Sequence, residues 1–275
     1  GNVGDLTYNY EIIENNTTKL REIFNSKSSL TKSIEKSKKP IFIFGESFLK
    51  LKSSSYLIYE LKKYLLSINK INEKWKPINI LAKNASTVGS YDLNIISGDT
   101  YNNEVLNRSL KNDFEVIFLI GQDNINFKKK NEFIIYIGSH GDQGAELSDI
   151  ILPGAAYTEQ DGYYTNLEGI IQKAYKATYP PGQAKEDWEI INDLSKYLKR
   201  KKIFDNKDIL ISKMFDYIKN NSQNQSLNIN YNFYEEEIFC EHIDYYYSNV
   251  VSRSSKTMSE CRSARNIIKK TGTEG

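Results

Sequence analysis

The amino-acid sequence predicts an α/β protein built on an open, doubly wound sheet, followed by an extended C-terminal tail. Three short runs rich in β-branched and aromatic residues each end in glycine, which is typical of buried parallel strands, and they cover residues 41–45, 116–121 and 133–138. A helical pattern lies between the first two runs. Strands that alternate with helices favour one layered sheet with right-handed crossovers.

The first predicted helix covers residues 53–68. Its apolar side chains recur at spacings of one, three and four, the pattern of a helix with one buried face, and they are Leu57, Ile58, Leu61, Leu65 and Ile68. A shorter apolar run at residues 78–81 adds another strand. From Gly138 onward the glycine-rich run to Ala145, the short apolar run 150–153 and the Tyr-rich stretch after it are typical of loops.

Helical periodicity returns at residues 184–198, directly after two prolines and a glycine that end the preceding loop. One face of this predicted helix carries Trp188, Ile191, Leu194 and Leu198. Beyond residue 199 the sequence predicts a helix at 208–219, a polar linker at 220–230 and a tail rich in Tyr and Glu.

These patterns predict three parts of the chain. Residues 1–38 form an N-terminal segment that packs on the core, and residues 39–200 form the α/β domain. Residues 201–275 form a C-terminal helix, a linker and a docking tail.

Composition excludes several classes of protein. The 275 residues are 39% hydrophobic, enough to bury a sizeable core. The longest apolar runs have five or six residues, far fewer than the roughly 20 that a membrane helix requires, so we expect no direct membrane insertion. The net charge is +2 with both signs interspersed, which argues against a nucleic-acid partner. The basic clusters 128–130 and 199–202 are typical of solvated faces.

The cysteine and histidine content argues against a metal centre. Cys240 and Cys261 are the only cysteines, whereas an iron–sulfur cluster needs four ligands, so no cluster is expected within this chain. His140 and His242 lie far apart in the sequence, without an evident cluster of carboxylates.

Two other kinds of site find weak support. The glycines that end the strands lack the spacing of a dinucleotide or phosphate loop, which disfavours a free-standing nucleotide-binding module. His140 in its glycine-rich loop could act as a general base, but a hydrogen-bonding loop residue is the more favoured interpretation. Six acids in the following stretch could pair as an acid and a base, or could satisfy backbone groups; they are Asp142, Glu146, Asp149, Glu159, Asp161 and Glu168.

Several ordered motifs resemble one family. Asp149 to Pro153 and Asn166 to Gly169 match the Asp-x-x-Leu-Pro and Asn-x-Glu-Gly elements of the molybdopterin oxidoreductases. Within that family the likeness is to the large iron–sulfur subunits of NADH:ubiquinone oxidoreductases. It rests on His140 to Ala145, Leu152 to Glu159, Pro180 to Trp188, Leu6 to Tyr8 and Ser252 to Met258.

The resemblance implies a fold of the molybdopterin oxidoreductase type whose cofactor has been lost. Where the family has Glu-Gly-Arg, this chain has Glu168, Gly169 and Ile170, so the basic group for an anionic cofactor is missing there. We therefore expect no catalytic, cofactor-binding or metal-binding residues in the chain. The alternative is a fragment of a catalytic molybdopterin oxidoreductase such as a formate dehydrogenase, in which Asn166 and Glu168 would contact cofactor.

The resemblance also implies partners and a location. The cysteine-rich, cluster-binding half of the subunit is absent from this sequence, so we expect a sheet that is incomplete at its N-terminal side and a split subunit. Iron–sulfur clusters would lie in the partner N-terminal half, and other peripheral-arm subunits would surround the chain. The expected location is the matrix side of the mitochondrial inner membrane.

The residues expected to matter are architectural. Glycines permit tight turns and a large aromatic side chain buries much area, so we expect six residues to shape the loop and Trp188 to anchor its helix. The six are Pro153, Gly154, Gly162, Asn166, Glu168 and Gly169.

Overall fold

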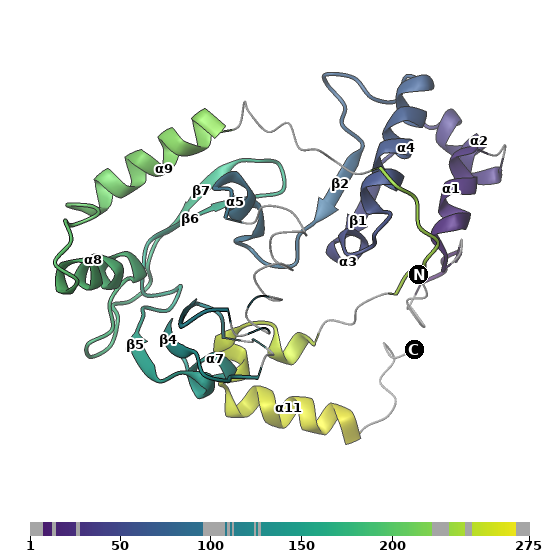
Figure 1. Ribbon diagram of the computed structural model, residues 1–275. Helices are drawn as coiled ribbons and strands as arrows, with labels where there is room; N and C mark the ends of the chain where they lie inside the picture. Colours follow the sequence, from purple (N-terminus) through teal and green to yellow (C-terminus); the bar gives the residue numbers. More distant parts are fainter. Residues whose placement is uncertain are drawn as a thin grey trace. The chain divides into compact units, whose positions relative to one another are not determined.

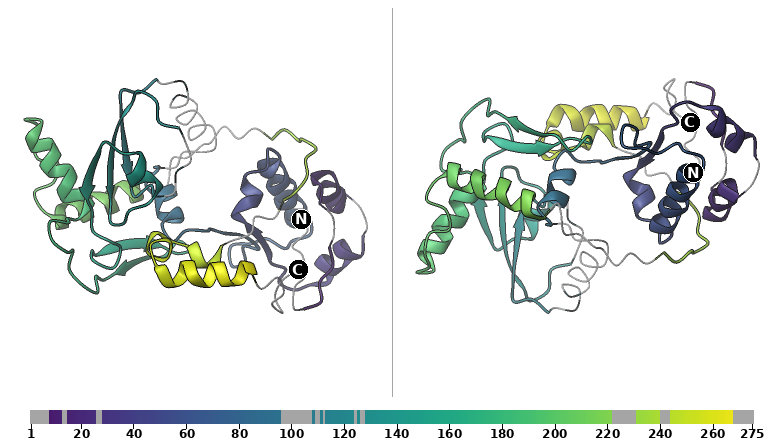
Figure 2. Two further views of the ribbon diagram at one scale, coloured as in Figure 1. Left: turned by 90° about the horizontal axis from the view of Figure 1, so that it is seen from below. Right: turned by 90° about the horizontal axis from the view of Figure 1, so that it is seen from above.

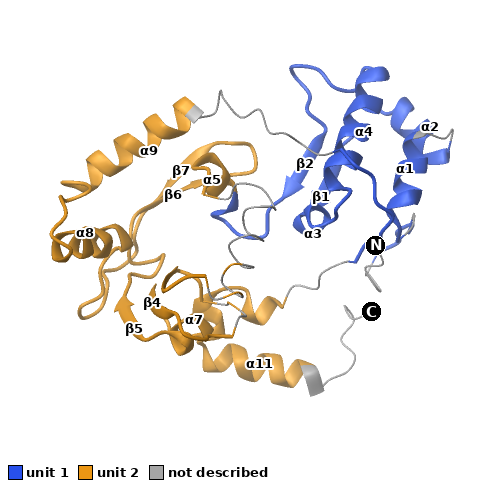
Figure 3. Cartoon of the chain, in the orientation of Figure 1, with its two compact units in different colours: residues 1–87, 226–243, 268–275 blue, residues 88–225, 244–267 orange. Residues whose placement is uncertain are grey.

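The computed structural model of the chain forms two compact units (Figure 3). Unit 1 comprises residues 1–87, 226–243 and 268–275, and unit 2 comprises residues 88–225 and 244–267. The residues that the structure describes are 8–12, 15–25, 28–95, 108, 111, 113–123, 125, 128–221, 231–239 and 244–267.

The described residues of unit 1 form helices α1 to α4 and a pair of parallel strands (Figure 1). The helices are α1 (Thr17–Asn25), α2 (Ser29–Lys36), α3 (Glu46–Leu49) and α4 (Ser54–Ser67). The strands are β1 (Phe42–Gly45) and β2 (Ile78–Leu81), paired with Phe42 opposite Ile78. The predicted strands 41–45 and 78–81 and the predicted helix 53–68 are thus confirmed.

The core of unit 1 lies where α4 meets α2. Leu61 and Leu65 of α4 are fully buried and pack with Ile34 of α2. These leucines lie four residues apart, so both project from one face of the helix, as the apolar spacing predicted. Ser28 caps the start of α2 by accepting a hydrogen bond from the Thr31 amide at 3.1 Å.

Residues 231–239, here called the returning segment, complete unit 1. The buried Ser53 hydroxyl donates to Tyr234 O at 2.6 Å and accepts from Tyr234 N at 2.8 Å. The buried Thr17 hydroxyl donates to Tyr234 O at 2.9 Å and accepts from Glu236 N at 3.0 Å. The side chains at the starts of α1 and α4 thus satisfy backbone N–H and C=O groups of the returning segment.

Unit 2 contains a three-stranded parallel sheet in the order β3-β4-β5 and an antiparallel hairpin, β6-β7. The strands are β3 (Val116–Ile120), β4 (Phe133–Gly138), β5 (Ile150–Pro153), β6 (Gly162–Thr165) and β7 (Ile171–Ala174). The helices are α5 (Thr87–Asp92, with Thr87 in unit 1), α7 (Gln143–Leu147), α8 (Asp187–Tyr197), α9 (Lys207–Asn221), η1 (Tyr245–Tyr247), α10 (Val250–Arg253) and α11 (Lys256–Ile267). Helix α11 is drawn in yellow in Figures 1 and 2.

The central strand β4 carries most of the core of unit 2. Ile134, Tyr136 and Ile137 are almost completely buried, and Leu119 of β3 packs beside them. A strand flanked on both sides is expected to be apolar on both faces, as this run is. The structure confirms the predicted strands 116–121 and 133–138 and the predicted helices 184–198 and 208–219, as β3, β4, α8 and α9.

Two sequence-based predictions were wrong. The stretch after Gly138 is not a plain loop, because it contains α7, β5 and the β6-β7 hairpin. Its strands have only four residues each, so their patterns were too short to stand out. The tail is extended in the returning segment but helical at α10 and α11, whose starts are fixed by local capping by Asn249 and Ser255.

The strands of the described residues form small sheets, so the single doubly wound sheet remains a prediction, as does the division at residues 38 and 200. No helix in the described ranges is both long enough and apolar enough to span a lipid bilayer.

The packing of α4 gives a direct test of the core. Replacing the fully buried Leu61 by alanine should lower the free energy of unfolding by about 2–5 kcal/mol, because it removes buried apolar contacts and leaves a cavity. Leu66→Ala on the exposed face of the same helix is the matched control and should change it by less than about 0.5 kcal/mol. Urea denaturation of both variants measures the difference, and equal losses would show that Leu61 is not a core residue.

Candidate functional site

The carboxyl ends of β4 and β5 meet the start of α8 in unit 2. Gly154 N donates to Gly138 O at 2.9 Å, and a Cβ added at Gly154 would lie 3.3 Å from Gly138 N and 2.9 Å from an Asp187 carboxylate oxygen. Only glycine at position 154 therefore allows this approach without a shift of its neighbours. In open parallel sheets ligands bind outside the carboxyl ends of the strands, so a functional site is expected at this edge.

A buried tyrosine organises the loop at this edge. The Tyr136 hydroxyl donates to the Asp123 carboxylate and lies 3.1 Å from the carbonyl oxygen of His140. Burial raises the pKa of Tyr136 far above its usual range, and the Asp123 carboxylate raises it further. The phenol is therefore neutral at physiological pH and acts as a structural hydrogen-bond donor. A Cβ at Gly138 would overlap the Tyr136 ring, and a Cβ at Gly144 would overlap the carbonyl oxygen of Gln122 and lie 3.1 Å from that ring.

An ion pair joins two of the family-like motifs. Arg253 Nε lies 2.5 Å from Asp142 Oδ2, and the two side chains are 19% and 17% exposed. Asp142 also caps α7, because its Oδ1 accepts from the Gln143 amide at 2.9 Å. The motif at residues 140–145 is thereby tied to the motif at residues 252–258. The negative charge of Asp142 is therefore neutralised by a cation of the same chain.

A second ion pair fixes the motif at residues 180–188. Glu186 Oε2 accepts from Lys207 Nζ at 2.5 Å and from Trp188 Nε1 at 2.8 Å. Lys207 also donates to Asp161 O at 3.1 Å. The Glu186 amide donates to the carboxylate of Glu189 at 3.2 Å, which closes the first turn of α8. Trp188 is half-buried in this arrangement.

Asp187 is the acid with the most unusual environment at this edge. Burial raises its pKa above the usual range, and the negative charges of Glu186 and Asp123 raise it further. A raised carboxyl pKa can mark a catalytic acid, but burial, its first cause here, also acts on structural residues. Because the pKa of Asp187 is higher in the folded state than in the unfolded state, folding favours the protonated carboxyl. The free energy of unfolding therefore falls as the pH rises from the unfolded-state pKa to the folded-state pKa.

His140 and the acids predicted as an acid–base set do not form one in the structure. The His140 ring lies beside the Ser139 hydroxyl, with 2.8 Å between Nδ1 and Oγ. Four of the six acids accept hydrogen bonds from backbone amides or from cations: Asp142, Asp149, Glu159 and Asp161. The Lys129 ammonium and the Ile134 amide hold the pKa of Asp149 below its usual range, so it stays ionised at neutral pH.

The Asn-x-Glu-Gly element forms the turn of the β6-β7 hairpin. Asn166 Oδ1 accepts from the amides of Glu168 and Ile170, both at 2.9 Å, and Gly169 has a φ of +80°. The amide side chain is thus used by the turn itself. Glu168 and Ile170 are exposed and supply no cation, so this turn does not fit an anionic pterin cofactor.

The other architectural residues lie near these contacts. Pro153 ends β5 and is exposed, and Gly162 begins β6 against the ring of Tyr164. Sequence reasoning found these turn positions but missed both ion pairs. The Glu186 and Glu189 spacing, three residues apart before an apolar run, is a helix-start signal that could have located one end of the second pair.

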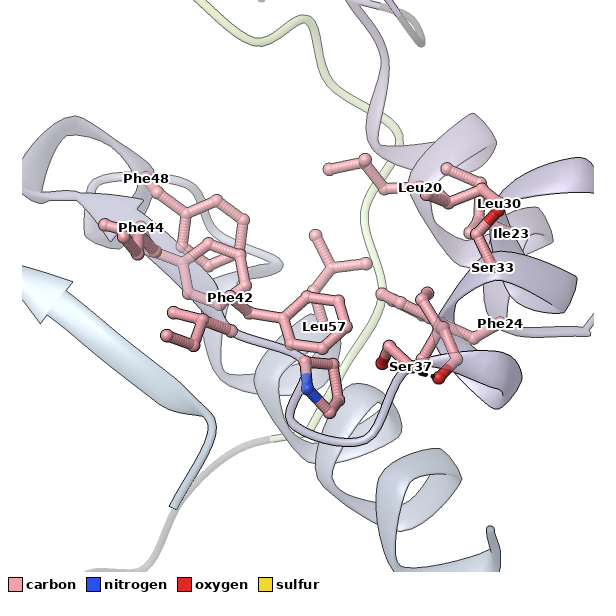
Figure 4. A pocket seen from close by; sticks show the side chains of 14 residues that line it. Leu20, Ile23, Phe24, Leu30, Ser33, Ser37, Phe42, Phe44, Phe48 and Leu57 are labelled. Carbon is pink, nitrogen blue, oxygen red and sulfur yellow. Dashed lines mark hydrogen bonds between the residues drawn. The ribbon is translucent and has the colours of Figure 1, made fainter. Parts of the chain in front are cut away.

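Each unit contains a cavity. In unit 1 a cavity of about 480 Å³ lies between α1, α2, β1 and α4, and its walls are almost entirely apolar (Figure 4). In unit 2 a cavity of about 760 Å³ is lined by Asp187, Trp188, Lys207 and apolar residues of α9. Within the described part of the chain, no group of three His, Cys, Asp or Glu is placed to hold a metal ion. Cys261 is exposed, whereas Cys240 and His242 lie outside the described residues.

The Asp142–Arg253 pair can be tested by a double-mutant cycle. Asp142→Ala and Arg253→Ala should show a coupling energy of about 1–3 kcal/mol, because the pair is mostly shielded from solvent. The matched control is Asp244–Arg262, a 2.6 Å pair with 37% and 45% exposed side chains, whose coupling should be about 0–1 kcal/mol and vanish in about 1 M salt. Equal coupling energies would contradict a special role for the first pair.

The turn of the hairpin gives another test. Gly169→Ala should lower stability by about 1–2 kcal/mol, because an L side chain is strained at its positive φ although no atom lies within 4 Å of the added Cβ. Gly141→Ala is the control, since it has equal space and no positive φ. Thermal unfolding of both variants distinguishes backbone strain from a general effect of alanine in loops.

Comparison with known proteins supplies the family. The pattern of the molybdopterin oxidoreductases matches residues 1–197. The NADH-ubiquinone oxidoreductase 75 kDa subunit of Reclinomonas americana is 37% identical over 281 residues, which cover 96% of this chain and 40% of the relative. An NADH-quinone oxidoreductase subunit from Rickettsia typhi is 35% identical over 94% of this chain and 38% of the relative.

A mitochondrial relative agrees with these two. The NADH-ubiquinone oxidoreductase 78 kDa subunit of Candida albicans is 34% identical over 85% of this chain and 34% of its own length. The chain thus spans about two fifths or less of the length of these curated relatives, and the expected likeness to the large subunits of NADH:quinone oxidoreductases is confirmed. Because the family pattern covers most of its length, the chain belongs to the molybdopterin oxidoreductase family.

Proposed function

We propose that this chain is a non-catalytic, structural part of the peripheral arm of NADH:ubiquinone oxidoreductase, respiratory complex I. It supports the iron–sulfur-bearing half of the large subunit while electrons pass from NADH to quinone. The relatives named above, all subunits of NADH:quinone oxidoreductases, support this role.

The observation that carries the proposal is that charged side chains from three of the family-like motifs form ion pairs within the chain. Asp142 is paired with Arg253, and Glu186 is paired with Lys207, each at 2.5 Å. Side chains that are occupied by one another in this way are not free to contact a substrate. Motif residues that bind one another and cap helices are suited to hold a fold, and this supports a scaffold.

The proposed role does not involve the metal–pterin cofactor of the family. When bound, a metal–pterin group supplies redox chemistry to catalytic members of the family. The hairpin turn, where Asn166 serves the backbone and Ile170 stands in place of a cation, offers no set of side chains that fits its anionic groups. In the proposed role the chain therefore holds no cofactor, and the iron–sulfur clusters belong to its partner half.

The proposal includes a fold, a location and partners. The parallel strands belong to the open, doubly wound sheet of the family. The chain is a peripheral part of a membrane complex, on the matrix side of the mitochondrial inner membrane. The mitochondrial subunit of Candida albicans supports the choice of organelle. Its partners are the iron–sulfur half of the large subunit and other peripheral-arm subunits, with no nucleic acid and no direct membrane insertion.

The rival proposal is a part of a catalytic molybdopterin oxidoreductase such as a formate dehydrogenase. The family match over residues 1–197 is the observation that favours it, since catalytic members share that pattern. Stoichiometric molybdenum or tungsten in the purified assembly would support this rival and overturn the scaffold.

The first test is to tag the chain, solubilise membranes gently and separate complexes on a native gel. We expect the chain to migrate with an NADH-oxidising band of very large mass. Mass spectrometry of that band identifies the polypeptide that carries the cluster-binding cysteines. Migration as a small separate species would overturn the proposal.

A further inference from the structure

Residues 196–203, the last two residues of α8 and the first part of the connection to α9, are here called the basic turn. It exposes two large apolar side chains, since Tyr197 is 85% and Leu198 is 64% exposed. Five cations stand within seven positions around them: Lys196, Lys199, Arg200, Lys201 and Lys202. The proposed scaffold role does not use this surface. A surface that combines concentrated charge with an exposed aromatic side chain is typical of a contact site.

The backbone of the basic turn is fixed from within unit 2. The buried Asn192 side chain donates to Phe204 O at 2.9 Å and accepts from Ile203 N at 3.0 Å. The Ser195 hydroxyl donates to Lys201 O at 2.8 Å. Asn192 thus binds three backbone groups of Ile203 and Phe204, where the basic turn ends, and this sets the shape of the turn before any partner arrives. A preformed turn loses less entropy on binding.

The cations at the centre of the basic turn are not neutralised within the described part of the chain. Lys199, Arg200 and Lys201 form no ion pair there, and the nearby Asp193 is held at 2.7 Å by Lys185. Lys202 donates to a carbonyl oxygen, Asp205 O, at 2.8 Å. The turn therefore presents excess positive charge, in contrast with the matched charges of the motif loops.

We propose that the basic turn is a docking surface for an acidic patch on a neighbouring protein. Tyr197 would fill an apolar depression at the centre of the contact, and Arg200 with its neighbouring lysines would pair with carboxylates around it. Tyrosine and arginine are enriched among the residues that dominate binding energy. A fixed turn with two protruding apolar side chains fits a shaped protein surface better than the flat, fluid surface of a lipid bilayer. The inference rests on the proposed function only in taking the partner to be a subunit of the same assembly.

The test places a photo-crosslinking amino acid at position 197 of the full chain in intact cells that assemble it. We expect a cross-link to one protein subunit, on a peptide rich in Asp and Glu, identified by mass spectrometry. The same amino acid at position 175 is the matched control, because Tyr175 is 75% exposed in unit 2 but lies outside the basic turn. An adduct to lipid, or no adduct specific to position 197, would overturn the docking surface.

Charge reversal adds a second readout. Lys199→Glu, Arg200→Glu and Lys201→Glu together should reduce the cross-link from position 197 by about tenfold, because the acidic patch now meets like charge. The control carries the same change of charge at Lys74, Lys76 and Lys83 of unit 1, which are exposed, and should leave the cross-link unchanged. Equal cross-linking in both variants would overturn the charge-based contact.

The two proposals fail in different ways. If the chain migrates with the large NADH-oxidising band but position 197 gives no specific adduct, the docking surface is wrong and the scaffold role stands. If position 197 cross-links an acidic protein in a chain that never enters that band, the scaffold role is wrong and the docking surface stands.

Discussion

The hydrogen bond between the Tyr136 hydroxyl and Asp123 is the contact on which unit 2 depends. Tyr136 belongs to the central strand, β4, and the bond ties that strand to the residues that follow β3. The same hydroxyl lies 3.1 Å from the carbonyl oxygen of His140, in the loop that follows β4. Gly138 and Gly144 leave space for the phenol ring, and the position of that loop in turn sets where Asp142 meets Arg253. Because an unpartnered buried hydroxyl or carboxylate would be strongly unfavourable, the arrangement has few alternatives.

The sequence predicted the elements with strong periodicity and missed those defined by distant partners. The strands at 116–121 and 133–138 and the helix at 53–68 were found because a buried face leaves a regular apolar pattern. The four-residue strands β6 and β7 were not, since their stability comes from each other and from a turn. The site was predicted as a set of turn residues, but its ion pairs join residues 111 and 21 positions apart, which no local pattern encodes.

The two ion pairs and the basic turn show two uses of charge in one unit. Asp142 and Glu186 each meet a cation at the start of a helix. The Asp142 carboxylate also caps α7, whereas the amide of Glu186 donates to the carboxylate of Glu189 in the first turn of α8. At the basic turn, by contrast, the polar groups that are satisfied are those of the backbone, and the side-chain charges remain for solvent or a partner. Internal charge matching suits a scaffold, whereas unmatched charge suits a surface of assembly.

The returning segment has a consequence for how the protein is made. Thr17 is separated by 217 residues from Tyr234, the residue that its hydroxyl contacts. At a synthesis rate of about 5–20 residues per second, α1 and α4 leave the ribosome about 10–40 s before the segment that completes them. Throughout that interval the polar groups of Thr17 and Ser53 and the apolar surface beside them stay open to wrong partners. Unit 1 is therefore open to a chaperone that binds nascent chains until residues 231–239 have been synthesised.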